Sequence, residues 1–454
     1  MEIYKDSFLL TTPMAKKLYN NCAKKLPVID YHNHLSVDDL IKDRKFNNLY
    51  ELWLESDPYK HRAMRICGIP EKYITGKATG YEKFEKWCEI FPSLVGNALF
   101  DWSLMELDRV FGIKDIPSPK TCKKIWDKAN EKLSKDGFSV QAILKKFNVE
   151  YIAPCVALTD DVKSLKEKAN CSFSVRCDDF LSIKKDVFEK LATVTKTEIV
   201  DLDNLKTALT KRIKSLKKNG LNFADHSLDN GFLYIKDDGK NDKRFKELLK
   251  EKELKEEDKN ALICELLRIL GGIYAKNKIV MQLHMGAQRT TSSRLRAVAG
   301  PAGGYAGIGN SVDSKSVVEF LNDLEEAAGL PKTLLFCLNP VDNALLSILS
   351  GSFSKDGVDA IVSEGPAWWW CDHMQGMLSM LDHYSSFSVL STFIGMTTDS
   401  RSVLSFSRHE YFRRVLCMWI GEKVEKGIFP NDYELLKGVV EKICYYNSKK
   451  VVEG

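Results

Sequence analysis

The 454-residue sequence lacks several features that would place it in a broad class of proteins at once. It has no excess of charge of one sign, because 67 basic residues oppose 62 acidic ones and leave a net charge of +5. This balance gives no reason to expect a nucleic-acid or membrane-surface partner. It also has no apolar run of membrane-spanning length, since the best stretch, near 266–283, is interrupted by charged and amide side chains. We therefore expect neither a nucleic-acid partner nor a membrane partner.

The sequence also lacks the marks of secretion. Its first residues, MEIYKDSFLL, contain no basic segment followed by an apolar one, so we expect no signal peptide. The twelve cysteines include no C-x-x-C pair and show no regular spacing. In a long chain of this kind, they indicate buried free thiols in a reducing compartment. The expectation is a soluble, cytoplasmic protein.

What the sequence does contain is a series of short apolar runs that end in polar or glycine-rich loops. There are eight, at 28–34, 149–155, 172–176, 222–227, 279–286, 333–339, 359–365 and 392–400. Such runs suit strands buried on both faces, as in a parallel sheet. Because helical patterns separate most of them, the sequence predicts an α/β protein and favours a (β/α)8 barrel over an open doubly wound sheet.

The connection between the first two runs is far longer than a crossover helix needs. It reads as helical and aromatic-rich, for example in FNNLYELWL and YEKFEKWCEIF. We interpret 36–148 as a helical insertion that grows from the first loop of a barrel formed by 1–35 and 149–454. Because that loop lies on the catalytic face of a barrel, the insertion is expected to cover the site.

Two histidines, His32 and His34, flank Asn33 at the end of the first run. Side chains at positions i and i+2 of a strand point the same way, so both imidazoles should project into the barrel mouth. Two neutral imidazoles aimed at one point are a natural pair of ligands for a divalent metal. The alternative is a pair of packed or surface histidines, and the position at a strand end favours the metal.

The last run ends in T-T-D-S-R, which places Asp399 and Arg401 beside the histidine pair, because closure of a barrel makes its first and last strands neighbours. Asp399 has three interpretations: metal ligand, catalytic base or cap of the next helix. Arg401 is a permanent, fork-shaped donor suited to a carboxylate or a polyol.

Other candidate residues lie at the ends of the remaining runs. His226 and His284 follow the fourth and fifth runs, and either one alone is more often a core histidine than a ligand. Arg176 closes the third run and, together with Arg401, suggests an anionic substrate, although a surface ion pair also explains an arginine. The Trp368–Trp370 run favours aromatic packing, with Trp369 as a ring that stacks on a sugar.

The order of motifs resembles the uronate (glucuronate) isomerase family along nearly the whole chain. The motifs are D-Y-H-N-H-L (30–35), T-D-D (159–161), L-H-M-G-A-Q-R (283–289), L-N-P-V-D-N (338–343), G-M-T-T-D-S-R-S (395–402) and R-H-E-Y-F-R-R (408–414). The resemblance implies a distorted (β/α)8 barrel of the amidohydrolase superfamily with a helical insertion after its first strand. It also implies an aldose–ketose isomerase that interconverts D-glucuronate and D-fructuronate through an enediol, and it leaves the D-galacturonate and D-tagaturonate pair open.

The resemblance also implies roles for individual residues. One divalent metal, expected to be zinc, is held by His32, His34 and Asp399. Because enediol chemistry needs a base and groups that polarise an oxygen, we expect Asp399 as base, with Tyr59 and His32 polarising the carbonyl. The residues expected to bind the substrate are Arg176, Arg401, His284, Trp369 and Arg408. The expected partner is a small hexuronate, and a homo-oligomer is left open.

The sequence departs from the family pattern near Tyr59. Where the family has D-H-Y-K-W-R, this chain has D-P-Y-K-H-R, so Pro58 replaces a family histidine and His61 replaces a tryptophan. Two other interpretations stand beside the isomerase. One is a metal-dependent hydrolase of the same superfamily, in which the metal activates water. The other is a catalytically silent binding protein, which rests on Pro58 alone.

Overall fold

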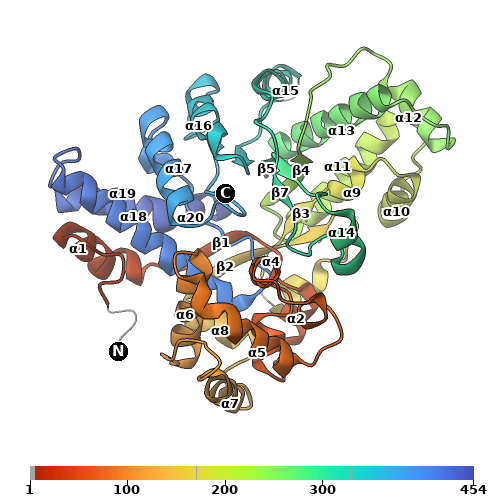
Figure 1. The fold of residues 1–454 in the computed structure, drawn as a ribbon. Coiled ribbons are helices and arrows are strands. Elements are labelled where there is room, and N and C mark those ends of the chain that lie inside the picture. The colour runs from red at the N-terminus through yellow and green to blue at the C-terminus, as the bar shows by residue number, and fades with distance from the viewer. Residues whose placement is uncertain (1–5, 170, 328, 454) are drawn as a thin grey trace.

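The structure, a computed structural model, describes residues 6–169, 171–327 and 329–453. Its centre is a curled parallel sheet in the order β1-β2-β3-β4-β5-β8-β9, with helices around it (Figure 1). The strands are β1 (Val28–Asn33), β2 (Val149–Ala157), β3 (Ser174–Arg176), β4 (Phe223–Asp229), β5 (Val280–Met285), β8 (Thr333–Cys337) and β9 (Val362–Glu364). A separate antiparallel pair is formed by β6 (Ala287–Gln288) and β7 (Gly307–Ile308). Seven of the eight expected runs are strands, and the α/β class is confirmed.

The expected eighth strand, 392–400, is wrong as a strand. A short 3-10 helix covers Leu390–Thr392, and the following residues run beside β1 without forming a regular ladder. Backbone and side-chain hydrogen bonds are mixed here. The Asp399 N–H donates to the His32 carbonyl at 3.1 Å, and the His34 N–H donates to the Ser400 carbonyl at 2.8 Å. The His32 N–H instead donates to Thr397 Oγ1 at 2.9 Å, and the Thr398 N–H donates to Asp30 Oδ2 at 2.9 Å. Asp399 also has a φ of +49°, which is incompatible with an extended strand.

The helices between β1 and β2 are gathered together on one side of the sheet, in orange in Figure 1. They are α2 (Val37–Lys42), α3 (Leu49–Trp53), α4 (Pro58–Ile66), α5 (Gly80–Ile90), α6 (Ala98–Phe111), α7 (Cys122–Leu133) and α8 (Val140–Lys146). Their starts follow local rules, as at α5, where Thr79 and Glu82 form a reciprocal capping box. The connection is therefore helical, as its sequence predicts.

The other helices pack around the strands. They are α1 (Pro13–Asn21), α9 (Asp178–Leu181), α10 (Lys185–Thr195), α11 (Leu202–Lys218), α12 (Asn241–Leu249), α13 (Glu256–Asn277), α14 (Ser293–Ala299), α15 (Ser314–Ala327), α16 (Asn343–Ser352), α17 (Met374–Phe387), α18 (Ser407–Glu425), α19 (Tyr433–Glu441) and α20 (Asn447–Glu453). Most of α18 is buried, and it packs against α1. No helix within the described residues is long and apolar enough to cross a membrane.

Candidate active site

His32, His34 and Asp399 meet at the carboxyl end of β1. Asp399 Oδ1 lies 3.2 Å from His32 Nε2 and 3.0 Å from His34 Nε2, so both rings point at one oxygen. Burial raises the pKa of Asp399, but the hydrogen bonds from the two histidines more than offset it and hold that pKa well below its usual range. Asp399 is therefore an ionised carboxylate at neutral pH.

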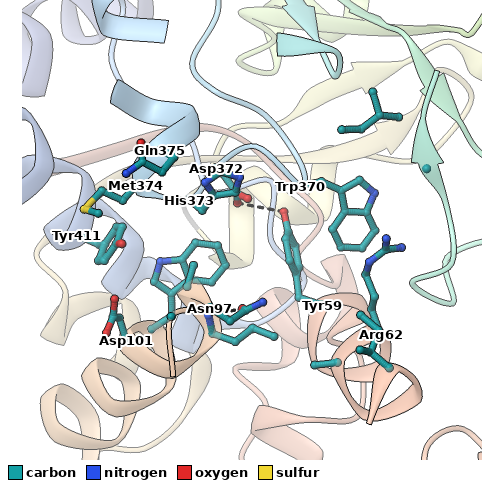
Figure 2. Close-up of a pocket in the computed structure, with 18 residues that line it drawn as sticks. Tyr59, Arg62, Asn97, Asp101, Trp370, Asp372, His373, Met374, Gln375 and Tyr411 are labelled. Atoms are coloured by element: carbon teal, nitrogen blue, oxygen red, sulfur yellow. Dashed lines mark hydrogen bonds between the residues drawn. The ribbon is translucent and has the colours of Figure 1, made fainter. Parts of the chain in front are cut away.

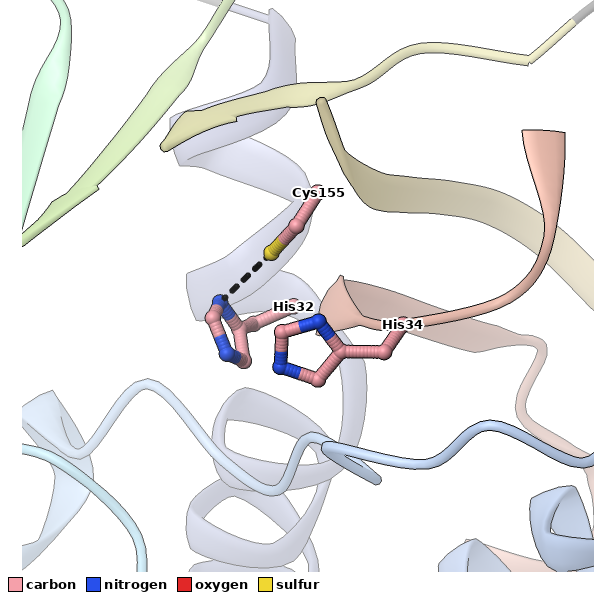
Figure 3. Close-up of side chains that lie close together, drawn as sticks. All are labelled: His32, His34 and Cys155. Atoms are coloured by element: carbon pink, nitrogen blue, oxygen red, sulfur yellow. Dashed lines mark hydrogen bonds between the residues drawn. The ribbon is translucent and has the colours of Figure 1, made fainter. Parts of the chain in front are cut away.

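Cys155, at the end of β2, lies with His32 and His34 in a group of side chains that could hold a metal ion. Its Sγ lies 3.7 Å from His32 Nδ1, and one ligand atom each of His32, His34 and Cys155 lies within 4.8 Å of the other two. Figure 3 shows the cysteine sulfur facing the His32 ring, with His34 beside it. Analysis of the sequence did not single out Cys155. The signal was its place as the last residue of the second apolar run, at the sheet edge where the histidines lie.

A buried carboxylate fixes the segment that carries Asp399. Asp30 accepts hydrogen bonds from the Thr398 N–H at 2.9 Å and from the Thr397 hydroxyl at 3.2 Å, and its Oδ2 lies 2.9 Å from His409 Nε2. Asp30 has no solvent exposure. These contacts stabilise the left-handed backbone at Asp399 and so hold its carboxylate against the histidines.

The two arginines proposed to bind a carboxylate differ in their surroundings. Arg176 is engaged: its Nε lies 2.6 Å from Asp178 Oδ2 and 3.5 Å from Asp225 Oδ2, and its Nη1 lies 3.3 Å from His34 Nε2. Arg401 is exposed, and no ion pair joins it to any of the residues that the structure describes. It borders a cavity of about 340 Å³ together with His34. Arg401 is therefore the freer cation beside the histidine pair.

The tryptophan run leads away from Asp399. Trp368 Nε1 donates to Asp399 Oδ2 at 3.0 Å. The Trp369 ring lies between those of Trp368 and Trp370, at centroid distances of 6.0 and 4.9 Å. The Trp370 ring in turn lies 4.8 Å from that of Tyr59. Trp368, and not Trp369, is thus the ring that contacts the Asp399 carboxylate.

The remaining histidines separate into two groups. The His284 ring lies 4.7 Å from the His32 ring and 4.7 Å from the Trp368 ring, so it belongs to the site. Burial lowers the pKa of His284 well below its usual value, which keeps the ring neutral. His226 faces the other way, with its ring 5.7 Å from Tyr274 of α13. It is a core histidine, buried between β4 and that helix.

Tyr59 reaches the site region from α4 rather than from a strand. Asp57 caps this helix by accepting from the Tyr59 and Lys60 N–H groups, and Pro58 occupies the first turn, where its fixed φ suits a helix start. The Tyr59 hydroxyl donates to Asp372 Oδ2 at 3.0 Å, as Figure 2 shows. Tyr59 and Asp372 line a cavity of about 580 Å³. Pro58 therefore has a structural role in starting the helix that carries Tyr59.

Arg408 lies behind Tyr59. It is 1% exposed, its Nη1 donates to Asp372 Oδ2 at 3.1 Å, and its guanidinium carbon lies 4.7 Å from the Tyr59 ring centre. In this structure Arg408 is therefore engaged with Asp372. Asp372 is the second site residue that analysis of the sequence missed, and its signal was the aspartate that ends the G-P-A-W-W-W-C-D loop.

Histidines, a carboxylate and arginines gathered at the carboxyl ends of parallel strands define an enzyme site of the α/β class. The profile of the family described as "Glucuronate isomerase" matches residues 1–452. The chain is 40% identical to the uronate isomerase of Caldanaerobacter subterraneus subsp. tengcongensis, over 98% of both chains. It is 38% identical to that of Clostridium perfringens, over 98% of this chain and 97% of the relative.

The chain is also similar in fold to solved structures of isomerases. The crystal structure of uronate isomerase from Thermotoga maritima superposes with a TM-score of 0.92 at 28% identity, covering 99% of this chain and 100% of the other. Glucuronate isomerase from Caulobacter crescentus shares the fold, with a TM-score of 0.89 at 19% identity over 99% and 97% of the two chains. The chain belongs to the glucuronate isomerase family, and it is an isomerase.

Proposed function

We propose that this enzyme interconverts D-glucuronate and D-fructuronate through an enediol, and that it also accepts the D-galacturonate and D-tagaturonate pair. The observation that carries the proposal is the meeting, at one sheet edge, of an ionised Asp399 with two imidazoles and with Arg401, which pairs with no carboxylate of the described residues. Isomerisation needs a base for the C2 proton, groups that polarise the sugar oxygens and a cation for the carboxylate. The site supplies each of these.

Asp399 is proposed as the base. It takes the proton from C2 of the open-chain aldose and returns it to C1, so that the double bond moves from C1–O1 to C2–O2. Its second oxygen is oriented by the Trp368 N–H, which fixes the carboxylate plane. An ionised carboxylate is a weak base that is fully available at neutral pH. The neighbouring histidines hold it in that form.

His32, His34 and Asp399 are also proposed to hold one divalent metal, with zinc as the expected ion. Two ligands of a tetrahedral zinc are about 3.4 Å apart, and the nitrogen–oxygen distances here are 3.2 and 3.0 Å. The residues present therefore fit such an ion. When bound, the ion supplies a Lewis acid that polarises the sugar oxygens. Cys155 lies on the Nδ1 side of His32, away from the shared oxygen.

The rest of the chain is proposed to shape the site. We infer that 393–400 closes the curled sheet against β1 into a distorted (β/α)8 barrel and that 36–148 forms a helical cover over its mouth. Arg62 of α4 supports the cover, because its Nη1 donates to the Ala306 carbonyl at 3.1 Å and its guanidinium stacks on Trp370. Arg176 and Arg401 bind the substrate carboxylate, and His284 and Trp369 line the sugar.

Incubation of the protein with each hexuronate, followed by detection of the ketose, tests this function. Substrate deuterated at C2 should give ketose that carries the label at C1 or releases it to solvent. Asp399→Asn keeps the shape but removes the base, so turnover should fall by about 10²–10⁴-fold. Ketose without transfer or release of the label excludes the enediol. Hydrolysis of an ester or amide without ketose formation favours the metal-dependent hydrolase instead.

A further inference from the structure

Asp372 occupies a buried position behind Tyr59. Its Oδ2 accepts hydrogen bonds from the Tyr59 hydroxyl at 3.0 Å and from Arg408 Nη1 at 3.1 Å. Asp372 is 4% exposed, and its other oxygen has no hydrogen-bond partner among the described residues. A carboxylate of this kind is balanced by one cation, and its Oδ2 already accepts the Tyr59 hydrogen bond, so this oxygen is placed to take the Tyr59 proton.

The direction of the Tyr59 hydrogen bond limits what this side chain can do. A phenol has one proton, and a carboxylate only accepts, so Tyr59 gives its proton to Asp372. Its oxygen therefore presents lone pairs to a bound sugar. In this arrangement Tyr59 accepts a hydrogen bond from a sugar hydroxyl and does not donate one to a carbonyl. This reverses the polarity expected for Tyr59 from the sequence.

We propose that Asp372, held by Arg408, receives a proton through Tyr59 during isomerisation. As C2 becomes a carbonyl, the O2 hydroxyl proton moves to the Tyr59 oxygen while the Tyr59 proton moves to Asp372 Oδ2. The reverse movement then places a proton on O1. The C2 proton travels separately, through Asp399 to C1, so no proton is gained or lost overall. The inference rests on the proposed function and adds Asp372 and Arg408 to it as positioning residues.

The electrostatics of the three residues favour a coupled transfer. Burial raises the pKa of Asp372, and Arg408 offsets this only in part, so the carboxylate has some affinity for a proton. Burial, and next the negative charge of Asp372, raises the pKa of Tyr59 well above its usual value. A free phenolate is therefore disfavoured, and Tyr59 can accept a proton only as it gives one up. The Arg408 cation, stacked between the Tyr59 and Trp102 rings, stabilises the charge that moves along this path.

The test compares Asp372→Asn, Tyr59→Phe and the double variant in the metal-loaded enzyme. An amide at 372 still accepts the Tyr59 hydrogen bond but cannot take its proton. We expect kcat for the hexuronate to fall by about 10²-fold with KM changed less than threefold. The double variant should be no slower than Tyr59→Phe alone, because both changes break one path. Glu364→Gln is the matched control: this carboxylate is equally buried, but its partner is Ser347 of α16.

Isotope effects separate the transfer from a structural role. If the O2 proton becomes rate-limiting in Asp372→Asn, the solvent deuterium effect on kcat should rise and the C2 deuterium effect should shrink. If Asp372→Asn instead displaced the base Asp399, the C2 deuterium effect should rise and the solvent deuterium effect should shrink. Either of two results overturns the proposal. One is a kcat of Asp372→Asn within threefold of wild type. The other is a loss in the double variant equal to the product of the two single losses, with unchanged isotope effects. If Asp372→Asn does not fold, Tyr59→Phe decides alone by the same isotope pattern. Wild type that makes no ketose overturns the proposed function itself.

Discussion

The contrast between Arg401 and Arg176 gives a sharp test of carboxylate binding. Arg401→Ala removes an exposed cation that has no ion-pair partner in the described residues, so it leaves no buried charge behind. Loss of one charge-assisted hydrogen bond costs about 1.5–3 kcal/mol, which lowers kcat/KM for a hexuronate by about 10- to 150-fold. The melting temperature should not change, because no ion pair or hydrogen bond among the described residues depends on this side chain.

Arg176→Ala should differ in stability. It leaves Asp225, which has no solvent exposure, without its cation. Breaking a buried pair on one side costs about 3–5 kcal/mol. We therefore expect a lowered melting temperature as well as weaker activity, measured by calorimetry and by initial rates on hexuronates and on the matching neutral hexoses.

Arg44→Ala serves as a control, because Arg44 borders the same cavity as Arg401 but pairs with Asp39 and Glu51. Arg44→Ala should not lower kcat/KM for the hexuronate more than it lowers kcat/KM for the matching neutral hexose. Equal losses on the uronate and the neutral hexose in Arg401→Ala would refute the reasoning, as would equal destabilisation of the Arg401→Ala and Arg176→Ala proteins.

Two further predictions concern the metal and the core. Elemental analysis should find about one divalent metal per chain. The metal should be lost in the His32→Ala/His34→Ala double variant and kept in Cys155→Ser. An unchanged metal content in the double variant contradicts the ligand assignment. Burial lowers the pKa of His226 to about 4, so its stabilising neutral form is fully present above about pH 6.5 and is lost as the pH falls toward 4. This amounts to about 3 kcal/mol at most. The free energy of unfolding, measured by denaturant titration at several pH values between 6.5 and 4, should therefore fall less steeply with pH in His226→Phe than in wild type. An identical pH dependence of the two proteins refutes the prediction.

Local patterns in the sequence were enough for most of the fold. Strands buried on both faces leave continuous apolar runs, which is why seven of them could be located from residues alone. The alternation of a strand likewise placed His32 and His34 on one side. Composition and motif order together indicated an α/β isomerase, and the helical character of the connection from β1 to β2 followed from its residues.

The tertiary structure decided what depends on contacts between distant segments. The segment 393–400 is apolar enough for a strand, but the side chains of Asp30 and Thr397 take the Thr398 and His32 N–H groups, and no local rule shows that competition. Cys155 and Asp372 became site residues only when β2 and the Trp368–Trp370 loop were brought beside β1 and α4. Their positions in the sequence, at the end of an apolar run and at the end of the G-P-A-W-W-W-C-D loop, did not show that they would meet the histidines and Tyr59.

The same limit applies to the direction of each side chain. Sequence analysis grouped His226 with His284 because both follow strands, yet one lies against α13 and the other against His32. It treated Arg401 and Arg408 alike, yet the first is exposed and the second is 1% exposed behind Tyr59. Residue type and spacing determined which groups were available. Packing decided which of them face the site, because burial and charge partners come from parts of the chain that are far apart in the sequence.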